Sequence, residues 1–152
     1  MRYIRHQPHG MSCGPVAVLN ALKWLGYSAS YRDHIFNFEW DFKNGTRHNS
    51  ITQSLREYGV KFKIKSNPTA ADIERILDNG RSVVLSWAWY EGGRSARHCI
   101  FIDGHTLTIF LSKNTWSNKS TKKDLMPKKT LNKYFRIGKR HDVKPKIWEI
   151  IK

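Results

Sequence analysis

The sequence is poor in cysteine and in acidic residues, and it contains no long hydrophobic run. Its two cysteines, Cys13 and Cys99, are too few for a disulfide-rich scaffold, and no closely paired cysteines suggest a structural zinc site. The longest uncharged, largely apolar stretch, residues 82–90, is far shorter than the roughly 20 residues that span a bilayer. No apolar segment near the N-terminus resembles a secretory signal. We therefore expect a cytoplasmic protein with reduced thiols, no metal, no cofactor and no membrane insertion.

Positive charge is abundant instead. The chain has 152 residues with a net charge of +15, and 39% of them are hydrophobic, which is enough for one packed domain over residues 1–152. More than half of the excess charge lies in residues 119–152, where hydrophobic residues are interleaved. We expect this segment to be a basic C-terminal extension packed on the domain. Its charge indicates either attraction to a polyanion or acidic partner, or a solvated face.

Local patterns place helices first and strands afterwards. Apolar periodicity predicts helices over residues 14–25, 51–57 and 70–78, with a strand over 60–65 between the last two. Glycine follows each helix, and Ser12 and Thr69 are candidate N-caps. Strands are expected over residues 82–89, 98–103 and 106–111, the last two joined by a Gly104-His105 turn, whereas residues 27–46 look irregular. The pattern indicates an α+β fold with an N-terminal helical part packed on an antiparallel sheet.

Cys13 is chemically prominent because it begins a predicted buried helix. Backbone N–H groups and the helix dipole stabilise negative charge there, which favours the nucleophilic thiolate. Gln7 precedes Cys13 by six residues across a short loop. Its amide and the backbone N–H of Cys13 are suited to form an oxyanion hole, and Gly14 allows close approach of the backbone.

His98 is the candidate base, since it opens a predicted core strand. An imidazole beside a thiolate holds the proton from sulfur and then delivers it to the leaving amine. Such a base needs an orienting group, and Asn114, sixteen residues later, follows the next predicted strand.

Asp103 competes with Asn114 for the orienting role. Strand alternation places Asp103 and Cys99 on the face opposite His98, which favours Asn114. The same alternation predicts that Cys99 is a packing residue behind the sheet.

Together these residues resemble the papain-like cysteine peptidases, most closely the C39-type, bacteriocin-processing group and its C39-like relatives. The resemblance rests on the order of Gln7, Cys13-Gly14-Pro15, the segment 97–102 and Asn114, and it covers about residues 1–118. It implies a papain-like fold, with Gln7 in the oxyanion hole, Cys13 as nucleophile, His98 as base and Asn114 as orienting residue. C39-type enzymes usually have aspartate at the last position, whereas papain has asparagine followed by Ser-Trp, similar to the Asn114-Thr115-Trp116 of this chain.

Two functions follow from these observations. The first is a cysteine peptidase-like hydrolase that cleaves a peptide or isopeptide bond through a thioester intermediate. Its substrate is a peptide or protein, and the basic charge of the chain is compatible with an acidic one. The alternative is a non-catalytic binding protein of papain-like fold, whose basic surface binds nucleic acid or an acidic protein partner. No recognised nucleic-acid motif supports the nucleic-acid partner, so it is secondary.

Overall fold

The structure is a computed structural model that describes residues 3–4, 8, 12–36, 38, 40–41, 45–91, 94–113, 125–141 and 144–152. Helices and strands alternate along the chain rather than forming two separate runs. The elements in chain order are α1 (Cys13–Trp24), α2 (Tyr31–Phe36), β1 (Trp40–Asp41), β2 (Gly45–Thr46), α3 (His48–Glu57), β3 (Lys61–Ser66), α4 (Ala70–Asp78), β4 (Ser82–Glu91), β5 (Arg94–His105), β6 (Ile109–Lys113), β7 (Leu125–Pro127), α5 (Lys128–Arg140) and β8 (Lys146–Ile151).

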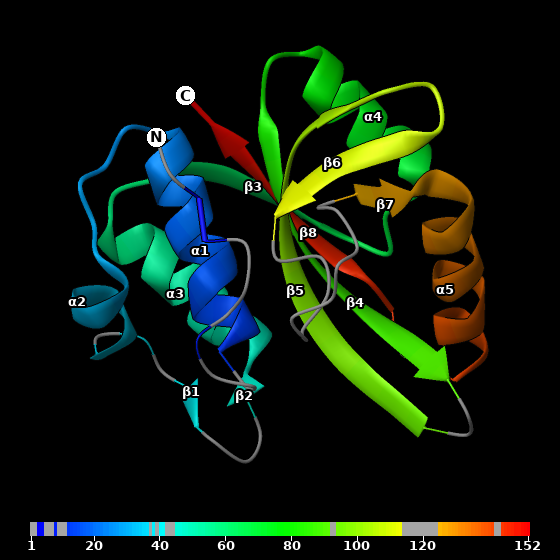
Figure 1. Ribbon diagram of the computed structural model, residues 1–152, viewed down its shortest axis with the longest axis horizontal. Helices are drawn as coiled ribbons and strands as arrows, with labels where there is room; N and C mark the ends of the chain where they lie inside the picture. The colour runs from blue at the N-terminus through cyan, green and yellow to red at the C-terminus, as the bar shows by residue number, and fades with distance from the viewer. Residues whose placement is uncertain are drawn as a thin grey trace.

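An antiparallel sheet divides the molecule into two halves. Its six strands follow the order β3-β8-β4-β5-β6-β7, while β1 and β2 form a separate short pair. Helices α1, α2 and α3 lie on one side of the sheet, and α4 and α5 lie on the other (Figure 1). The expected α+β organisation is present, with helices on both faces.

Each face of the sheet has its own hydrophobic core. On the first face, Leu22 of α1 and Ile51 and Leu55 of α3 belong to one cluster with Phe101 and Trp148 of the sheet. On the second face, residues of α4 and α5 belong to a cluster with the alternate residues of β5; it includes Ile73, Leu131, Phe135, Ile100 and Ile102. The alternation predicted for residues 99–102 is therefore confirmed for their packing.

The predicted helices are present with small shifts of their ends. Gly26, Gly59 and Gly80, which follow three of them, have φ values of +88°, +69° and +72°, the left-handed conformation that favours glycine. Thr69 caps α4 in a reciprocal capping box with Asp72, as the sequence predicts.

Three local predictions need correction. Ser12 holds the N-cap position of α1, but its side chain makes no capping hydrogen bond to the helix. The β5–β6 hairpin turns at residues 106–108 instead of Gly104-His105, since β5 continues to His105 and the Thr106 N–H donates to the Ile109 carbonyl. Residues 31–36, which the sequence analysis leaves irregular, form α2.

The basic C-terminal part of the chain enters the sheet. Strand β8 lies between β3 and β4, and its Trp148 is fully buried. Helix α5 buries Leu131, Phe135 and Gly138, whose spacing of four and three residues gives one helical face.

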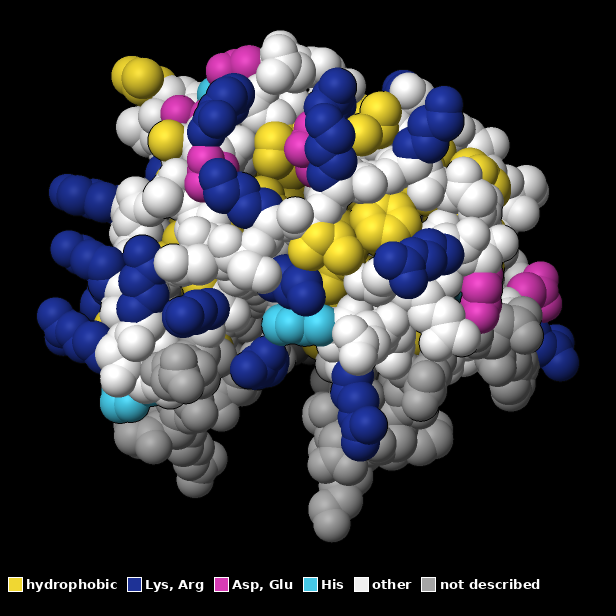
Figure 2. Space-filling view, turned by 180° about the vertical axis from the view of Figure 1, so that it is seen from behind, with side chains coloured by type: hydrophobic (Ala, Val, Ile, Leu, Met, Phe, Trp, Pro, Cys, Tyr) yellow, Lys and Arg dark blue, Asp and Glu magenta, His cyan; other side chains and the backbone are white. Residues whose placement is uncertain are grey.

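The opposite face of α5 is exposed and basic. Seen from behind, Lys and Arg side chains project from the edge of the molecule that α5 forms (Figure 2). The exposed basic residues of α5 are Lys129, Lys133, Arg136, Lys139 and Arg140. Among the described helices, none is both long and apolar enough to cross a membrane.

Candidate active site

Cys13 is the first residue of α1, and its position follows from how that helix begins. Ser12 and the residues after Cys13, from Gly14 to Leu22, are buried, so the helix start is held inside the molecule. The backbone N–H groups of the first turn have no carbonyl partner within the helix, and together with the dipole they favour a negative charge on the sulfur.

Three groups lie within hydrogen-bonding reach of the Cys13 sulfur. They are the thiol of Cys99, the imidazole of His98 and the backbone N–H of Cys99. The hydrogen bond from the Cys99 thiol, and then the hydrogen bond and charge of His98, hold the pKa of Cys13 well below its usual value, although burial opposes this. The site therefore favours a thiolate at Cys13, beside the imidazole of His98.

Cys99 packs in the core on one face of the sheet, as predicted, and it also contacts Cys13. Alternation separates the side chains of His98 and Cys99, but it says nothing about a group beside the strand. Pairing of β5 with β6 begins at Phe101↔Lys113, so the earlier part of β5 has no partner strand on that side among the described residues. Cys13 lies beside this part of β5, where it meets the Cys99 backbone as well as both side chains.

The pKa of Cys99 shifts in the opposite direction to that of Cys13. Its hydrogen bond to Cys13 and its burial raise the pKa of the Cys99 thiol well above the usual value, although Ser86 and Arg97 act in the opposite direction. Of the two thiols, Cys13 is thus the one that ionises, and Cys99 is the donor that stabilises it.

His98 is buried, with 4% of its surface exposed, and its ring packs edge-on against Trp87 at 6.3 Å between centroids. An indole at this position excludes water from one side of the imidazole, which strengthens the electrostatic contact between His98 and Cys13.

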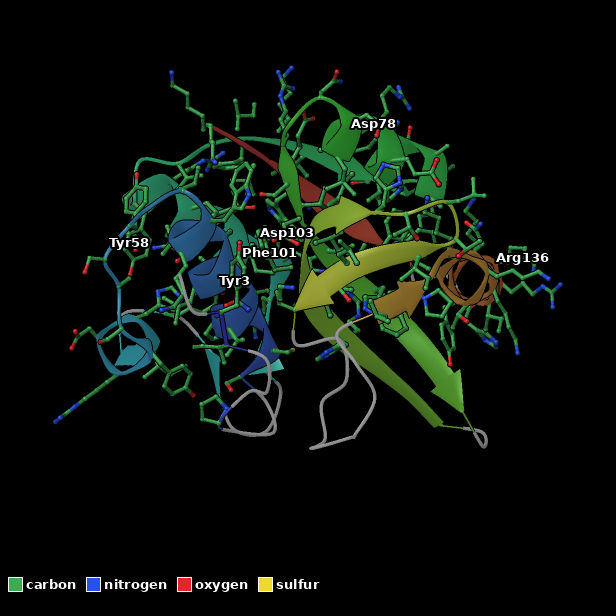
Figure 3. The ribbon with its side chains drawn as sticks, turned by 45° about the horizontal axis from the view of Figure 1, so that its top comes forward. Tyr3, Tyr58, Asp78, Phe101, Asp103 and Arg136 are labelled. Carbon is green, nitrogen blue, oxygen red and sulfur yellow. The ribbon has the colours of Figure 1, made fainter. Side chains whose placement is uncertain are left out.

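Asp103 faces a different partner. Tyr3, Phe101 and Asp103 lie together between α1 and the sheet (Figure 3), with the Tyr3 and Phe101 rings 5.7 Å apart. Burial, with the charge and hydrogen bond of Asp103, raises the pKa of Tyr3 to about 12. Asp103 therefore holds the N-terminal segment, and the expectation that it points away from His98 agrees with this contact.

His34 is a positioning residue that the sequence analysis did not find. Its Nε2 contacts the carbonyl oxygen of Pro15 at 3.0 Å, and its Nδ1 contacts the Tyr58 hydroxyl at 2.9 Å. Since a carbonyl only accepts, Nε2 carries the proton and Nδ1 accepts from Tyr58. Burial lowers the pKa of His34 to about 4, so a neutral ring joins α2 and the end of α3 to the first turn of α1.

Asn20 is a second such residue. Its side chain is fully buried and forms two hydrogen bonds with the Ile4 backbone: Oδ1 accepts from the N–H at 2.8 Å, and Nδ2 donates to the carbonyl at 2.9 Å. This arrangement imitates strand pairing and fixes the N-terminal segment beside α1. A polar residue inside a predicted apolar helix was the available sequence signal.

Comparison with known proteins identifies the family. Residues 2–142 match the profile described as the Peptidase_C39 like family. The chain belongs to this family. The match reaches well beyond residue 118, where the resemblance in the sequence ends, and it includes all of α5.

Solved structures show that this C39-like chain has a papain-like peptidase fold. The peptidase domain of Streptococcus ComA, a bifunctional ABC transporter involved in quorum sensing, has a TM-score of 0.69 at 14% identity, covering 100% of both chains. A structure described as a C39-like peptidase from Bacillus anthracis has a TM-score of 0.68 at 11% identity, covering 99% of this chain and 94% of that one. A double glycine motif protease from an AMS/PCAT transporter, in complex with the leader peptide, has a TM-score of 0.67 at 10% identity, covering 97% and 91%. No curated protein matches the sequence significantly.

Of the four site residues predicted for this C39-like protein, the structure brings Cys13 and His98 together. Gln7 and Asn114 lie outside the described residues. No group of three or more His, Cys, Asp or Glu side chains suited to a metal ion occurs in the part of the chain that the structure describes.

Proposed function

We propose that this C39-like chain, as one domain over residues 1–152, is a cysteine peptidase that cleaves a peptide or isopeptide bond through a thioester on Cys13. The observation that carries the proposal is the contact of the Cys13 sulfur with His98 and with the Cys99 thiol at the start of α1. A thiolate at a helix N-terminus, beside an imidazole, is the arrangement that acyl transfer to sulfur requires.

The reaction follows from these positions. The Cys13 thiolate attacks the substrate carbonyl carbon, and the carbonyl oxygen becomes an oxyanion. As the C–N bond breaks, the imidazolium of His98 gives its proton to the leaving amine, and a thioester forms on Cys13. His98 then takes a proton from water, whose oxygen attacks the thioester. The second product leaves as a carboxylic acid and Cys13 is regenerated.

Gln7 and Asn114 are proposed to complete the site. Gln7 follows Ile4, which Asn20 fixes beside α1, and its amide is assigned to the oxyanion hole together with the backbone N–H of Cys13. Asn114 follows Lys113, which pairs with Phe101 on the strand of His98, and its amide is assigned to orient the imidazole. An amide orients the ring without adding charge, so the neutral residue is compatible with this mechanism.

A peptide is the proposed substrate class, because a structurally similar protease is known in complex with a leader peptide. An extended peptide beside Cys13 would place its scissile carbonyl near the first turn of α1, where the oxyanion donors are proposed.

Selective alkylation tests the proposal. At about pH 6, where an ordinary thiol is almost entirely protonated, iodoacetamide is expected to label Cys13 and not Cys99. His98→Ala should slow this labelling and abolish cleavage of a peptide library, whereas His105→Ala, at a partly buried histidine that pairs with Asp78, should change neither. Equal, slow labelling of both cysteines, or peptide cleavage that survives Cys13→Ala, would contradict the proposal.

A further inference from the structure

A basic pocket lies next to the candidate site. It has a volume of about 350 Å³ and is open to solvent, and its lining residues are Arg47, His48, Asn49 and Arg97. The first three come from the beginning of α3, whereas Arg97 comes from β5 and directly precedes His98.

A short series of polar contacts connects the pocket to Cys13. Ser86 pairs with Cys99 across β4 and β5, and the two side chains are within hydrogen-bonding reach. The Ser86 hydroxyl also lies 2.8 Å from Nε2 of His48, on the pocket wall. The pocket is thus one layer of side chains away from the thiol that Cys13 contacts, and its Arg97 lies two residues before Cys99 on β5.

His48 holds Arg97 in place without adding charge. Nη1 of Arg97 lies 3.3 Å from Nε2 of His48, so the guanidinium rests against the ring. Burial, and then the charges of Arg97 and Lys146, lower the pKa of His48 to about 4, so the ring is neutral near pH 7. Its neutrality leaves the positive charge on the side chains that face solvent.

The positive charge of the pocket is not neutralised within the described residues. Neither Arg47 nor Arg97 pairs with a carboxylate in that part of the chain, whereas Arg75 and Arg81 elsewhere each do. Both pocket guanidiniums are exposed, and the Asn49 amide offers a further donor beside them. Two planar guanidinium groups around one opening are suited to bidentate binding of a carboxylate.

We infer that this pocket binds a carboxylate of the peptide substrate, so that Arg47 and Arg97 give the peptidase a preference for an acidic residue near the cleaved bond. The inference rests on the proposed function, because it takes the occupant to be part of a peptide that also reaches Cys13. A carboxylate has two sources in a peptide, the side chain of Asp or Glu and the free C-terminus. Both share the chemistry that the guanidiniums recognise.

The inference is tested by alkylating Cys13 with reactive probes that differ only in carrying a carboxylate or an amide. The probes are N-iodoacetyl-Glu-amide and its Gln twin, made with no, one or two glycine spacers, and the rate constant for alkylation of Cys13 is followed by mass spectrometry. We expect the Glu probe to react about tenfold faster than its Gln twin at the best spacer length, since a charge-assisted hydrogen bond is worth this factor or more. A third probe, ending in glycine with a free carboxylate, separates the C-terminal source from the side-chain source.

Arginine variants show where the preference arises. Arg47→Gln and Arg97→Gln should each reduce the ratio of the Glu and Gln alkylation rate constants toward one. Because both probes react with the same thiol in a given variant, any effect of the substitution on thiol reactivity cancels in this ratio. Lys133→Gln on α5 makes the same charge change far from the pocket and should keep the ratio. A ratio near one in the unmodified protein, or a ratio that the arginine variants leave unchanged, would overturn the inference.

A binding measurement keeps the two proposals separate. If Cys13 does not react with any probe, the proposed function fails, and the pocket is tested by NMR titration with N-acetyl-Glu-amide and N-acetyl-Gln-amide. Shifts of the Arg47 and Arg97 side-chain signals with the Glu ligand alone would support the carboxylate site, and equal or absent shifts with both ligands would refute it.

Discussion

Replacing Cys99 with alanine should raise the pKa of Cys13. In the structure the Cys99 thiol donates to the Cys13 sulfur, and this contact is the largest of those that lower the pKa of Cys13. A hydrogen bond to a charged group contributes about 1.5–3 kcal/mol, and a thiol is a weak donor, so the lower end applies. One pKa unit corresponds to about 1.4 kcal/mol, and the expected rise is therefore about one unit. The value should still lie below that of an ordinary thiol, because His98 and the backbone N–H of residue 99 remain.

The assay is the rate of iodoacetamide alkylation as a function of pH, whose midpoint reports the pKa of the thiol. Cys99→Ala leaves Cys13 as the only cysteine of the chain, so all of the labelling measured in this variant occurs at Cys13. Cys99→Ser is the matched control, since a hydroxyl still donates, and it should keep the midpoint low. Urea unfolding of each variant shows that the comparison is made on folded protein. A midpoint that does not move in Cys99→Ala, or that moves downward, would refute the role given to Cys99.

Three further outcomes concern stability. The pKa of His34 is about 4 in the folded protein and about 6.5 in an unfolded chain, so His34 stabilises the fold fully above pH 6.5 and loses this contribution as pH falls toward 4. Urea unfolding should therefore show that the free energy of unfolding falls by about 2–3 kcal/mol between neutral pH and about pH 4.5. This fall should be smaller in His34→Gln. Asn20→Ala leaves the N–H and carbonyl of Ile4 without partners and should cost about 2–3 kcal/mol in the same assay, whereas a cost below about 0.5 kcal/mol would show that the contact is dispensable. Trp148→Ala removes a fully buried ring from β8 and should cost about 3–5 kcal/mol, and a near-neutral effect would contradict the interior position of that strand.

Local chemistry made part of this molecule predictable. The helix that starts at Cys13, the capping box at Thr69 and the glycine helix ends depend on neighbouring residues, so the sequence alone indicates them. Cys13 and His98 were expected to meet because their order and flanking residues resemble C39-like peptidases, and the structure brings them into contact. Their catalytic roles, and those of Gln7 and Asn114, stay predictions.

The features that the sequence did not predict depend on contacts between distant parts of the chain. Alternation along β5 predicts the two faces of the strand but not its edge, and it is at the edge that Cys99 meets Cys13. The composition of residues 119–152 suggested a basic extension packed on the domain, but it did not show that β8 is an interior strand of the sheet. His34 could not be found from its neighbours, because its partners, Pro15 and Tyr58, come from other parts of the chain.

The central claim is that Cys13 forms a covalent acyl intermediate. Intact-mass spectrometry of the protein, quenched in acid during turnover of a peptide library, tests this most directly. The account predicts an adduct with the mass of an acyl fragment, mapped to the peptide that contains Cys13, present in the unmodified protein and absent from Cys13→Ala and His98→Ala. Cleavage without any adduct, continuing in Cys13→Ala, would contradict it.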